Sequence, residues 1–532
     1  MEKKQKSFVQ GAALLGAAGL IVKIIGAIFR IPFANAVGPE GACYYDAAYP
    51  YYSFLLVISS SGLPTAISKQ VSERVALGDH AGAKEVLGVS VKLLSIIGII
   101  TSVAMFLGAN VFAAITSYPE TVLSFRALAP ALLFVSVMCA YRGYLQGMQR
   151  MTGTALSQIV EQVGKLAIGL TLAIKLLPKG PEYAAMGALI GVTASEFLAL
   201  LTIIFVYNRY RPSIRRHMEQ SAPCAPSPIA KNLILLAVPI TLGASISSLS
   251  GMVDSAMIIR ILLNLGYSKD TAQTAYSLLR SNVTTLTNMP GVLTMALAMS
   301  LVPAISASVA RRDKSSVQNI SRLGMKLALI IGLPCAVGLF VLAKPILGML
   351  YPRLTEAQLT LAADLMHTAS IGVIFLSLVQ AMTGIIQGLG KPNVPLFNLF
   401  IGFILKVITL VVLTNIPSIN IQGASISTVI CYAFAGIADT AYAVRKAHIN
   451  MNLWDVILKP VLSSAVMGAM VYMCFAFMNK LGHVTLGVLL SVTLGVCVYG
   501  ILAIYLRMFS REELNYIPGG RKLKRLIYGS EK

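Results

Sequence analysis

The chain has 532 residues, of which 56% are hydrophobic and only 12% are charged. This composition excludes an ordinary soluble globule and predicts a polytopic membrane protein. The net charge of +22 does not indicate a nucleic-acid partner, because the cations concentrate in alternate connections between apolar stretches. The 7 cysteines and 5 histidines are scattered, so we expect no disulfide framework, no metal site and no cofactor.

Apolar stretches of about twenty residues follow one another along nearly the whole chain. They predict an all-α protein with about fourteen transmembrane helices, since the bilayer offers no water to unpaired backbone groups. The predicted spans begin near residues 8, 43, 87, 122, 153, 183, 231, 274, 321, 364, 395, 420, 456 and 484. The positive-inside rule places both termini in the cytoplasm, Arg142 in a cytoplasmic connection and Asp46 in an outer one.

The first predicted span carries two cations, Lys23 and Arg30, which are seven residues apart and therefore lie on one helical face. A cation inside a span costs roughly 2.5–3.5 kcal/mol on insertion scales, which favours a functional role for both. The alternative is that Arg30 lies near the end of the span and reaches the lipid headgroups. A second span, ending with residues 253–260, closes with Arg260 in the same place.

Short motifs recur at matching places in the two halves of the chain. The matches are PTAIS at 64–68 with PAIS at 303–306, QG at 146–147 with QG at 387–388, and Lys165 with Lys406. Each copy would hold about six spans, an even number, so both copies have the same orientation. We therefore predict two six-helix lobes in a parallel repeat, related by an axis along the membrane normal, with two further helices appended.

This organisation gives five predicted segments. They are an N-terminal lobe at residues 1–207, a cytoplasmic linker at 208–230, a C-terminal lobe at 231–448, two additional helices at 449–506, and a basic cytoplasmic tail at 507–532.

Cations dominate the ionisable residues inside the predicted spans. The candidates for binding an anionic substrate are Lys23, Arg30, Arg260 and Arg280. A cleft lined by guanidinium groups suits a phosphate or diphosphate, because arginine offers a planar fork of donors that stays charged. A lipid-linked sugar carries such a group, together with a hydrocarbon tail that remains in the bilayer.

Acids are fewer, and Glu161, Glu196 and Asp254 are the candidates for binding a coupling ion. Glu161 and Lys165 are four residues apart, so a neutralised structural pair is the alternative there. Farther along, Pro290 and Gly291 are predicted to break the eighth span near its middle and to act as a hinge.

Three stretches, at residues 30–41, 62–73 and 288–306, resemble the stage V sporulation protein B and polysaccharide-transporter branch of the multidrug, oligosaccharidyl-lipid and polysaccharide flippase superfamily. The resemblance implies a fourteen-helix, two-lobed fold in the bacterial cytoplasmic membrane. It also implies a transporter rather than an enzyme, which moves a polyprenyl-diphosphate-linked glycan from the inner to the outer leaflet by alternating access. The segment 23–26 resembles the first-helix cationic motif of the lipid II flippases, and Arg280 resembles an eighth-helix arginine of their cavity.

This family implies membrane lipids and cell-wall synthesis proteins as partners, and a role in peptidoglycan or polysaccharide biosynthesis or in sporulation. The main alternative is a cation-coupled drug or metabolite antiporter of the same superfamily, which would rely on buried acids. A membrane glycosyltransferase would need catalytic carboxylates in an extended loop, whereas the outer connections are short. No Walker motif is present, so we expect the membrane potential, at roughly 2.3 kcal/mol per charge per 100 mV, to bias export.

Overall fold

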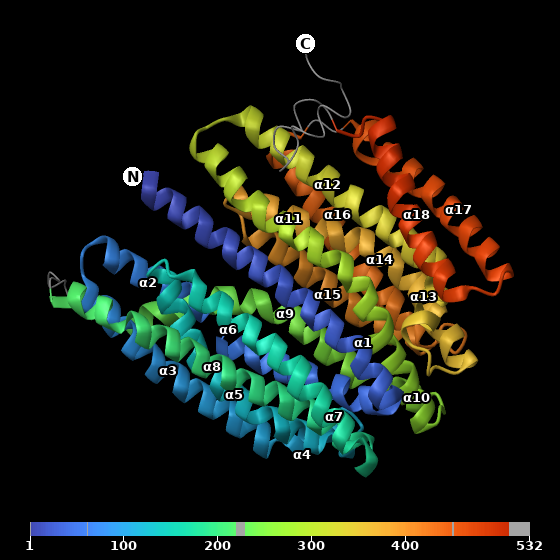
Figure 1. Ribbon diagram of the computed structural model, residues 1–532, viewed down its shortest axis with the longest axis horizontal. Helices are drawn as coiled ribbons and strands as arrows, with labels where there is room; N and C mark the ends of the chain where they lie inside the picture. The colour runs from blue at the N-terminus through green and yellow to red at the C-terminus, as the bar shows by residue number, and fades with distance from the viewer. Residues whose placement is uncertain (1, 61, 220–228, 450–451, 510–532) are drawn as a thin grey trace. The chain divides into compact units, whose positions relative to one another are not determined.

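A computed structural model describes residues 2–60, 62–219, 229–449 and 452–509. Throughout these residues every regular element is helical and no strand occurs (Figure 1). Ten helices in the described chain are long and apolar enough to cross a membrane. The prediction of an all-α, multi-pass membrane protein is therefore confirmed.

The count of fourteen spans stays a prediction. Nine of the predicted starts fall within the ten candidate spans, and a tenth, near residue 420, lies two residues before the candidate span Gln422–Lys446. The other four, near residues 8, 43, 153 and 231, fall in helices α1, α6 and α9. Helix α1 joins two predicted spans across a kink, and none of these four starts lies in one of the ten candidate spans of the described residues.

The chain divides into two compact units, residues 1–277 and 278–532. Unit 1 contains, in order, α1 (Glu2–Ser60), α2 (Leu63–Ala76), α3 (His80–Leu107), α4 (Ala109–Ile115), the 3₁₀ turn η1 (Pro119–Thr121), α5 (Val122–Gly147), α6 (Met151–Gly164), the π-turn η2 (Lys165–Gly169), α7 (Leu170–Leu176), the 3₁₀ turn η3 (Leu177–Lys179), α8 (Pro181–Glu219), α9 (Ile229–Asn264) and α10 (Lys269–Ser277). The boundary between the units lies after the predicted linker at 208–230, because α9 and α10 pack against α1 of unit 1. The Ser255 hydroxyl of α9, for example, donates to the carbonyl of Ala47 at 2.9 Å. The lobe boundaries inferred from the sequence remain predictions.

Helix α1 reverses direction at Gly38, where φ is 71° and ψ is −179°. This backbone conformation is essentially restricted to glycine, and Pro39 follows directly. The reversal is visible in the contacts: Arg30 and Asp46, 16 residues apart, form an ion pair. In a straight helix they would be separated by roughly 24 Å. Two antiparallel arms therefore lie side by side, one on each side of Gly38.

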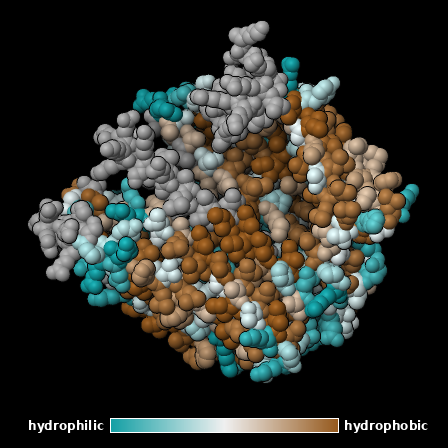
Figure 2. Space-filling view, in the orientation of Figure 1, coloured by the Kyte–Doolittle hydropathy of each residue, from teal (hydrophilic) through white to brown (hydrophobic). Residues whose placement is uncertain are grey.

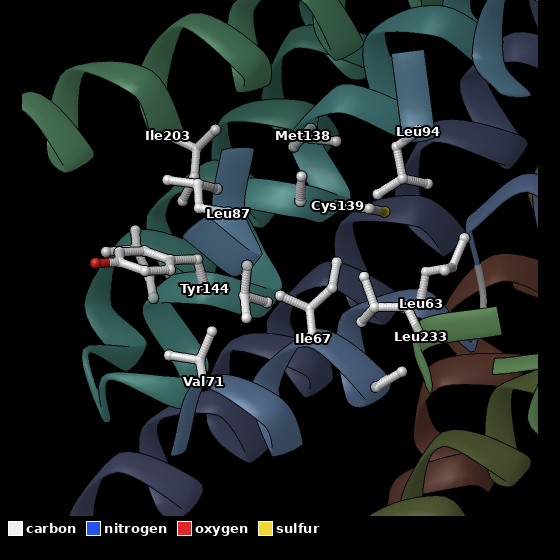
Figure 3. Packing of buried hydrophobic residues seen from close by; sticks show 14 of the residues in the cluster. Leu63, Ile67, Val71, Leu87, Leu94, Met138, Cys139, Tyr144, Ile203 and Leu233 are labelled. Atoms are coloured by element: carbon white, nitrogen blue, oxygen red, sulfur yellow. The ribbon is translucent and has the colours of Figure 1, made fainter. Parts of the chain in front are cut away.

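The hydrophobic core of unit 1 forms where α2 packs against α5, as Figure 3 shows. Leu63, Ile67 and Val71, spaced four residues apart, present one apolar face of α2. Glycines on α5 permit the close approach: a Cβ atom at Gly143 would lie 2.9 Å from the Ile67 Cβ, and one at Gly147 would lie 2.6 Å from the Val71 Cβ. Small residues at four-residue spacing are the usual means of close helix packing in membranes.

Unit 2 contains the π-turn η4 (Leu278–Val283), α11 (Thr284–Ala310), α12 (Lys314–Val341), α13 (Ala343–Leu350), α14 (Glu356–Gly388), α15 (Asn393–Thr414), α16 (Gln422–Lys446), the π-turn η5 (Trp454–Leu458), α17 (Lys459–Lys480) and α18 (Val484–Tyr505). It repeats the packing device of unit 1. A Cβ at Gly384 of α14 would lie 2.8 Å from the Ala298 carbonyl oxygen, and one at Gly388 would lie 2.8 Å from the Ile305 Cβ. Matching motifs in the two halves therefore produce matching helix contacts.

The helix that follows the charged loop begins in the same way in both units. The Asp79 carboxylate accepts a hydrogen bond from the Gly82 amide at 2.7 Å and caps α3. The Asp313 carboxylate accepts one from the Ser316 amide at 3.0 Å and caps α12. Hydrogen bonds from Ser316 hold the pKa of Asp313 below its ordinary value, as expected when a carboxylate accepts donors at a helix N-terminus.

Hydrophobic side chains cover much of the surface seen in Figure 2. Among the most exposed large ones are Phe205 on α8, Phe477 on α17 and Val496 on α18, at 68%, 64% and 70% exposure. Apolar exposure on this scale is unfavourable in water but matches the hydrocarbon interior of a bilayer. The surface and the long apolar helices therefore agree on a membrane location.

Candidate functional site

Charged side chains meet inside unit 1, and the first of them is Arg30 on α1. Its guanidinium forms an ion pair with Asp46, whose side chain is only 1% exposed. The sequence placed Asp46 in an outer connection; in the structure it lies within α1 and its side chain is buried, and its depth in the membrane stays a prediction. The turn at Gly38 is so tight that the second arm of α1 begins at once and carries Asp46 back alongside Arg30. The charge of Arg30 is thus largely compensated within its own helix.

A second ion pair joins α5 to α6. The Arg142 Nη2 lies 3.0 Å from the Glu161 Oε2, and its Nε donates to the Ser157 hydroxyl at 2.9 Å. The sequence placed Arg142 in a cytoplasmic connection, and this stays a prediction; in the structure α5 continues to Gly147 and holds Arg142 at 12% side-chain exposure.

The local pair expected between Glu161 and Lys165 does not form. Glu161 turns to Arg142, and the helix widens into the π-turn η2 where Lys165 begins it. A π-turn has hydrogen bonds between residues five apart, so it disrupts the spacing of four on which the expected pair depended. π-Turns inside helices frequently mark functional sites.

The ammonium of Lys165 lies among three aromatic rings of α1. Its Nζ is 5.3 Å from the ring centre of Phe29, 5.9 Å from that of Tyr45 and 4.8 Å from that of Tyr49. We call these three residues the aromatic box. Such contacts are worth about 0.5–2 kcal/mol each, more where water is excluded. The box supplies attraction without supplying a counter-charge.

Glu196 on α8 is the remaining acid of the cluster and is 6% exposed. It lies close enough to Glu161, Arg142 and Lys165 to interact with their charges. No residue that the structure describes donates a hydrogen bond to its Oε2. Helix α8 packs closely against α6 beside Glu196, since a Cβ at Gly164 of α6 would lie 2.9 Å from the Cβ of the neighbouring Ser195.

The cluster thus contains three cations and three carboxylates. Two ion pairs, Arg30 with Asp46 and Arg142 with Glu161, compensate four of the six charges. Within the described chain, Lys165 and Glu196 are left without an ion-pair partner. Chemically, the cluster offers one cation to an anionic ligand and one carboxylate to a proton or metal cation. Elsewhere in the described residues, no three His, Cys, Asp or Glu side chains gather closely enough to hold a metal ion.

Arg280 lies in unit 2, within the π-turn η4, and is partly exposed. Two partly exposed cations, Lys165 and Arg280, therefore occupy π-turns. The next residue in η4, Ser281, accepts a hydrogen bond through its carbonyl from the Tyr351 hydroxyl at 3.5 Å.

The break predicted at Pro290 and Gly291 is absent, since α11 continues through both residues. A proline removes one backbone donor, but the flanking residues keep helical geometry, and the irregularity of this span is η4. Gly291 instead provides room for α14: a Cβ there would lie 3.2 Å from the Gln380 Nε2. A hinge at this place stays a prediction.

The other candidates are dispersed. Arg260 is exposed near the end of α9, four residues before Asn264, and Asp254 on the same helix is buried at 6% exposure. The side chain of Lys23 lies outside the described residues. Sequence reasoning did not assign a functional role to Arg142, Asp46 or Lys165. The helical spacing of Tyr45, Tyr49 and Tyr52 was a signal for an aromatic face on α1.

Many apolar helices around buried, partly paired charges define an integral membrane protein built like a transporter. The model of a family described as polysaccharide biosynthesis protein matches residues 8–309, more than half of the chain. The chain therefore belongs to this family, within the multidrug, oligosaccharidyl-lipid and polysaccharide flippase superfamily. A second family model, MatE, matches residues 239–412.

Curated relatives align along nearly the whole chain. Stage V sporulation protein B of Bacillus subtilis is 26% identical over 97% of this chain and 98% of its own length. Lipid II flippase MurJ of the same organism is 26% identical over 86% of this chain and 87% of its own. A solved structure of lipid II flippase MurJ in an inward closed conformation matches with a TM-score of 0.69 at 15% identity, over 93% of this chain and 99% of that one. The fold is therefore that of this superfamily.

Proposed function

We propose that this protein is a flippase that exports a polyprenyl-diphosphate-linked glycan, such as a lipid II-like peptidoglycan precursor or a polysaccharide unit, from the inner to the outer leaflet. The observation that carries the proposal is the end-to-end similarity to relatives, one of which is named a lipid II flippase. The buried cations support it, because a diphosphate needs charged donors wherever it leaves water.

In this proposal the cations recognise the diphosphate. Arg30 and Arg280 are the principal contacts, with Lys23 and Arg260 as further ones. Arg280 stands in a π-turn and is partly exposed, so its guanidinium has access to a ligand. Arg30 is held by Asp46, which orients the guanidinium while leaving 22% of the side chain exposed. Export proceeds by alternating access, with bending at Pro290 and Gly291.

Coupling to an ion falls to the acids. Glu196 is the strongest candidate because it is buried next to Glu161 and no described residue donates to its Oε2. Two carboxylates that share one cation, Arg142, favour uptake of a proton or a metal cation by one of them. Asp254, buried on α9, is a second candidate. The membrane potential adds a bias, since a diphosphate carries negative charge outward.

The location that fits this function is the bacterial cytoplasmic membrane, with both termini in the cytoplasm and proteins of cell-wall synthesis as partners. The biological setting would be peptidoglycan or polysaccharide synthesis in growth or sporulation. A second function, cation-coupled antiport of a drug or metabolite, is favoured by the match of the MatE model to residues 239–412 and by the buried acids of unit 1.

Native mass spectrometry of the purified protein separates the two functions. We expect adducts with a polyprenyl-diphosphate disaccharide, weaker adducts with the corresponding monophosphate, and none with a lipophilic cationic drug. The matched lipids differ by one phosphate, so the comparison isolates recognition of the diphosphate. Adducts with the drug but not with the diphosphate lipid would make the antiporter the better account.

A further inference from the structure

Two of the three cations in the charged cluster are paired with carboxylates, but Lys165 is not. Arg30 is bonded to Asp46 and Arg142 to Glu161. Lys165 has no carboxylate within ion-pair distance among the residues that the structure describes. A paired arginine offers an incoming anion only part of its charge, and binding must compete with the internal partner. Among the three cations of the cluster, Lys165 therefore carries the charge that no carboxylate compensates.

The contacts of Lys165 suit temporary storage of an ammonium group. Three rings surround its Nζ at 4.8 to 5.9 Å from their centres. Cation–π attraction is weaker than a charge-assisted hydrogen bond to a phosphate oxygen. Lys165 is also partly exposed rather than fully buried, and its flexible four-carbon stem can redirect the ammonium. An anion that approaches would therefore outcompete the aromatic box.

We propose that Lys165 is a further anion contact of unit 1 beside Arg30, and that its ammonium leaves the aromatic box to bind an oxygen of the transported diphosphate. The proposal rests on the proposed function and deepens it. While the substrate is absent, the box holds the Lys165 ammonium beyond ion-pair distance of Glu196. Glu196 nevertheless lies near enough to interact with the charge of Lys165. Loading of substrate at Lys165 thus changes the electrostatic surroundings of Glu196, which places substrate binding and ion binding in one cluster.

The test is a set of equilibrium binding titrations on the full-length protein in nanodiscs. The probes are polyprenyl diphosphate, inorganic diphosphate and phosphatidylglycerol, which share phosphate chemistry but differ in source. Lys165→Met removes the charge and keeps the length, and a thioether packs well against aromatic rings. Lys165→Arg keeps the charge. Lys175→Met is the matched control, since Lys175 is an exposed lysine on α7, ten residues away in sequence.

We expect Lys165→Met to weaken polyprenyl diphosphate binding about tenfold, the loss of one charge-assisted hydrogen bond. The affinity of Lys165→Arg for polyprenyl diphosphate should stay within about threefold of that of the wild type. The affinity of Lys175→Met should equal that of the wild type. The variants should rank in the same order in their affinity for inorganic diphosphate. All of them should bind it more weakly, because it lacks the polyprenyl tail. Equal affinity of the wild type and Lys165→Met for polyprenyl diphosphate would overturn this inference while leaving the proposed function intact. No diphosphate binding by the wild type would overturn both.

The source of the anion and the role of the box are tested separately. A loss in Lys165→Met confined to phosphatidylglycerol would identify a lipid headgroup site and overturn the assignment to the transported diphosphate. Tyr49→Leu removes the nearest ring. If the box stores the ammonium, this variant should bind polyprenyl diphosphate about two- to fivefold more tightly, because less attraction is lost on release. Binding as weak as that of Lys165→Met would show that the box positions Lys165 instead.

Discussion

Replacing Arg142 with methionine should destabilise unit 1 strongly. Arg142 donates to Ser157 and to Glu161, and its side chain is only 12% exposed. Its removal leaves Glu161 without its cation, beside the buried Glu196. Breaking a buried pair by removing one partner costs about 3–5 kcal/mol, more than the pair itself is worth.

The size of the effect depends on the carboxylate that is left behind. We therefore expect Arg142→Met/Glu161→Gln to recover most of the loss, since no uncompensated charge then remains at position 161. Arg126→Met is the matched control on the same helix, because Arg126 is exposed and contacts the ring of Phe106 at 5.7 Å. Its cost should stay below about 1 kcal/mol.

Thermal unfolding in detergent, followed by fluorescence-detected size-exclusion chromatography, measures these differences. Arg142→Met should melt well below both the wild type and Arg126→Met, and the double variant should fall close to the wild type. If Arg142→Met melts with the wild type, the ion pair is not a structural element. If the double variant is as unstable as the single one, the uncompensated carboxylate is not the cause.

Three further outcomes follow from the structure. Gly38→Ala should cost about 1–3 kcal/mol of stability in the same melting assay, because φ is 71° at Gly38. The control Gly88→Ala on α3, where a Cβ meets nothing within 4 Å, should be neutral or stabilising. Equal effects of the two substitutions would refute the hairpin at Gly38. Glu196→Gln should abolish the response of translocation to an imposed proton or sodium gradient. The control Glu182→Gln, in the first turn of α8, should keep that response. An unchanged response in Glu196→Gln would exclude Glu196 from coupling. Arg280→Gln should lower the translocation rate at least about tenfold at equal amounts of folded protein, and a wild-type rate would remove Arg280 from the substrate site.

The sequence sufficed for the class of fold because hydropathy is a local property. Long apolar stretches can satisfy their backbone groups in a bilayer only as helices, and the helices observed lie where those stretches predict them. Short motifs in the two halves also indicated matching contacts, as Gly147 and Gly388 show. Residues 30–41, 62–73 and 288–306 carry the resemblance to the superfamily in the sequence itself.

The pairing of charges could not be predicted in the same way, because it depends on which helices meet. Asp46 reaches Arg30 only because the chain reverses at Gly38. The rule for residues four apart favoured a pair of Glu161 with Lys165. Glu161 instead pairs with Arg142 on another helix, and a π-turn begins at Lys165. The aromatic box likewise combines Phe29 and Tyr49 from the two arms of α1 with a lysine more than a hundred residues later.

The account is tested most directly by measuring translocation of a polyprenyl-diphosphate disaccharide in proteoliposomes containing the purified wild-type protein, with an imposed membrane potential. Substrate should reach the opposite leaflet faster than in protein-free vesicles, and the rate should rise when the potential favours outward movement of negative charge. A rate equal to that of protein-free vesicles at either potential would contradict the assignment of this protein as a lipid-linked glycan flippase.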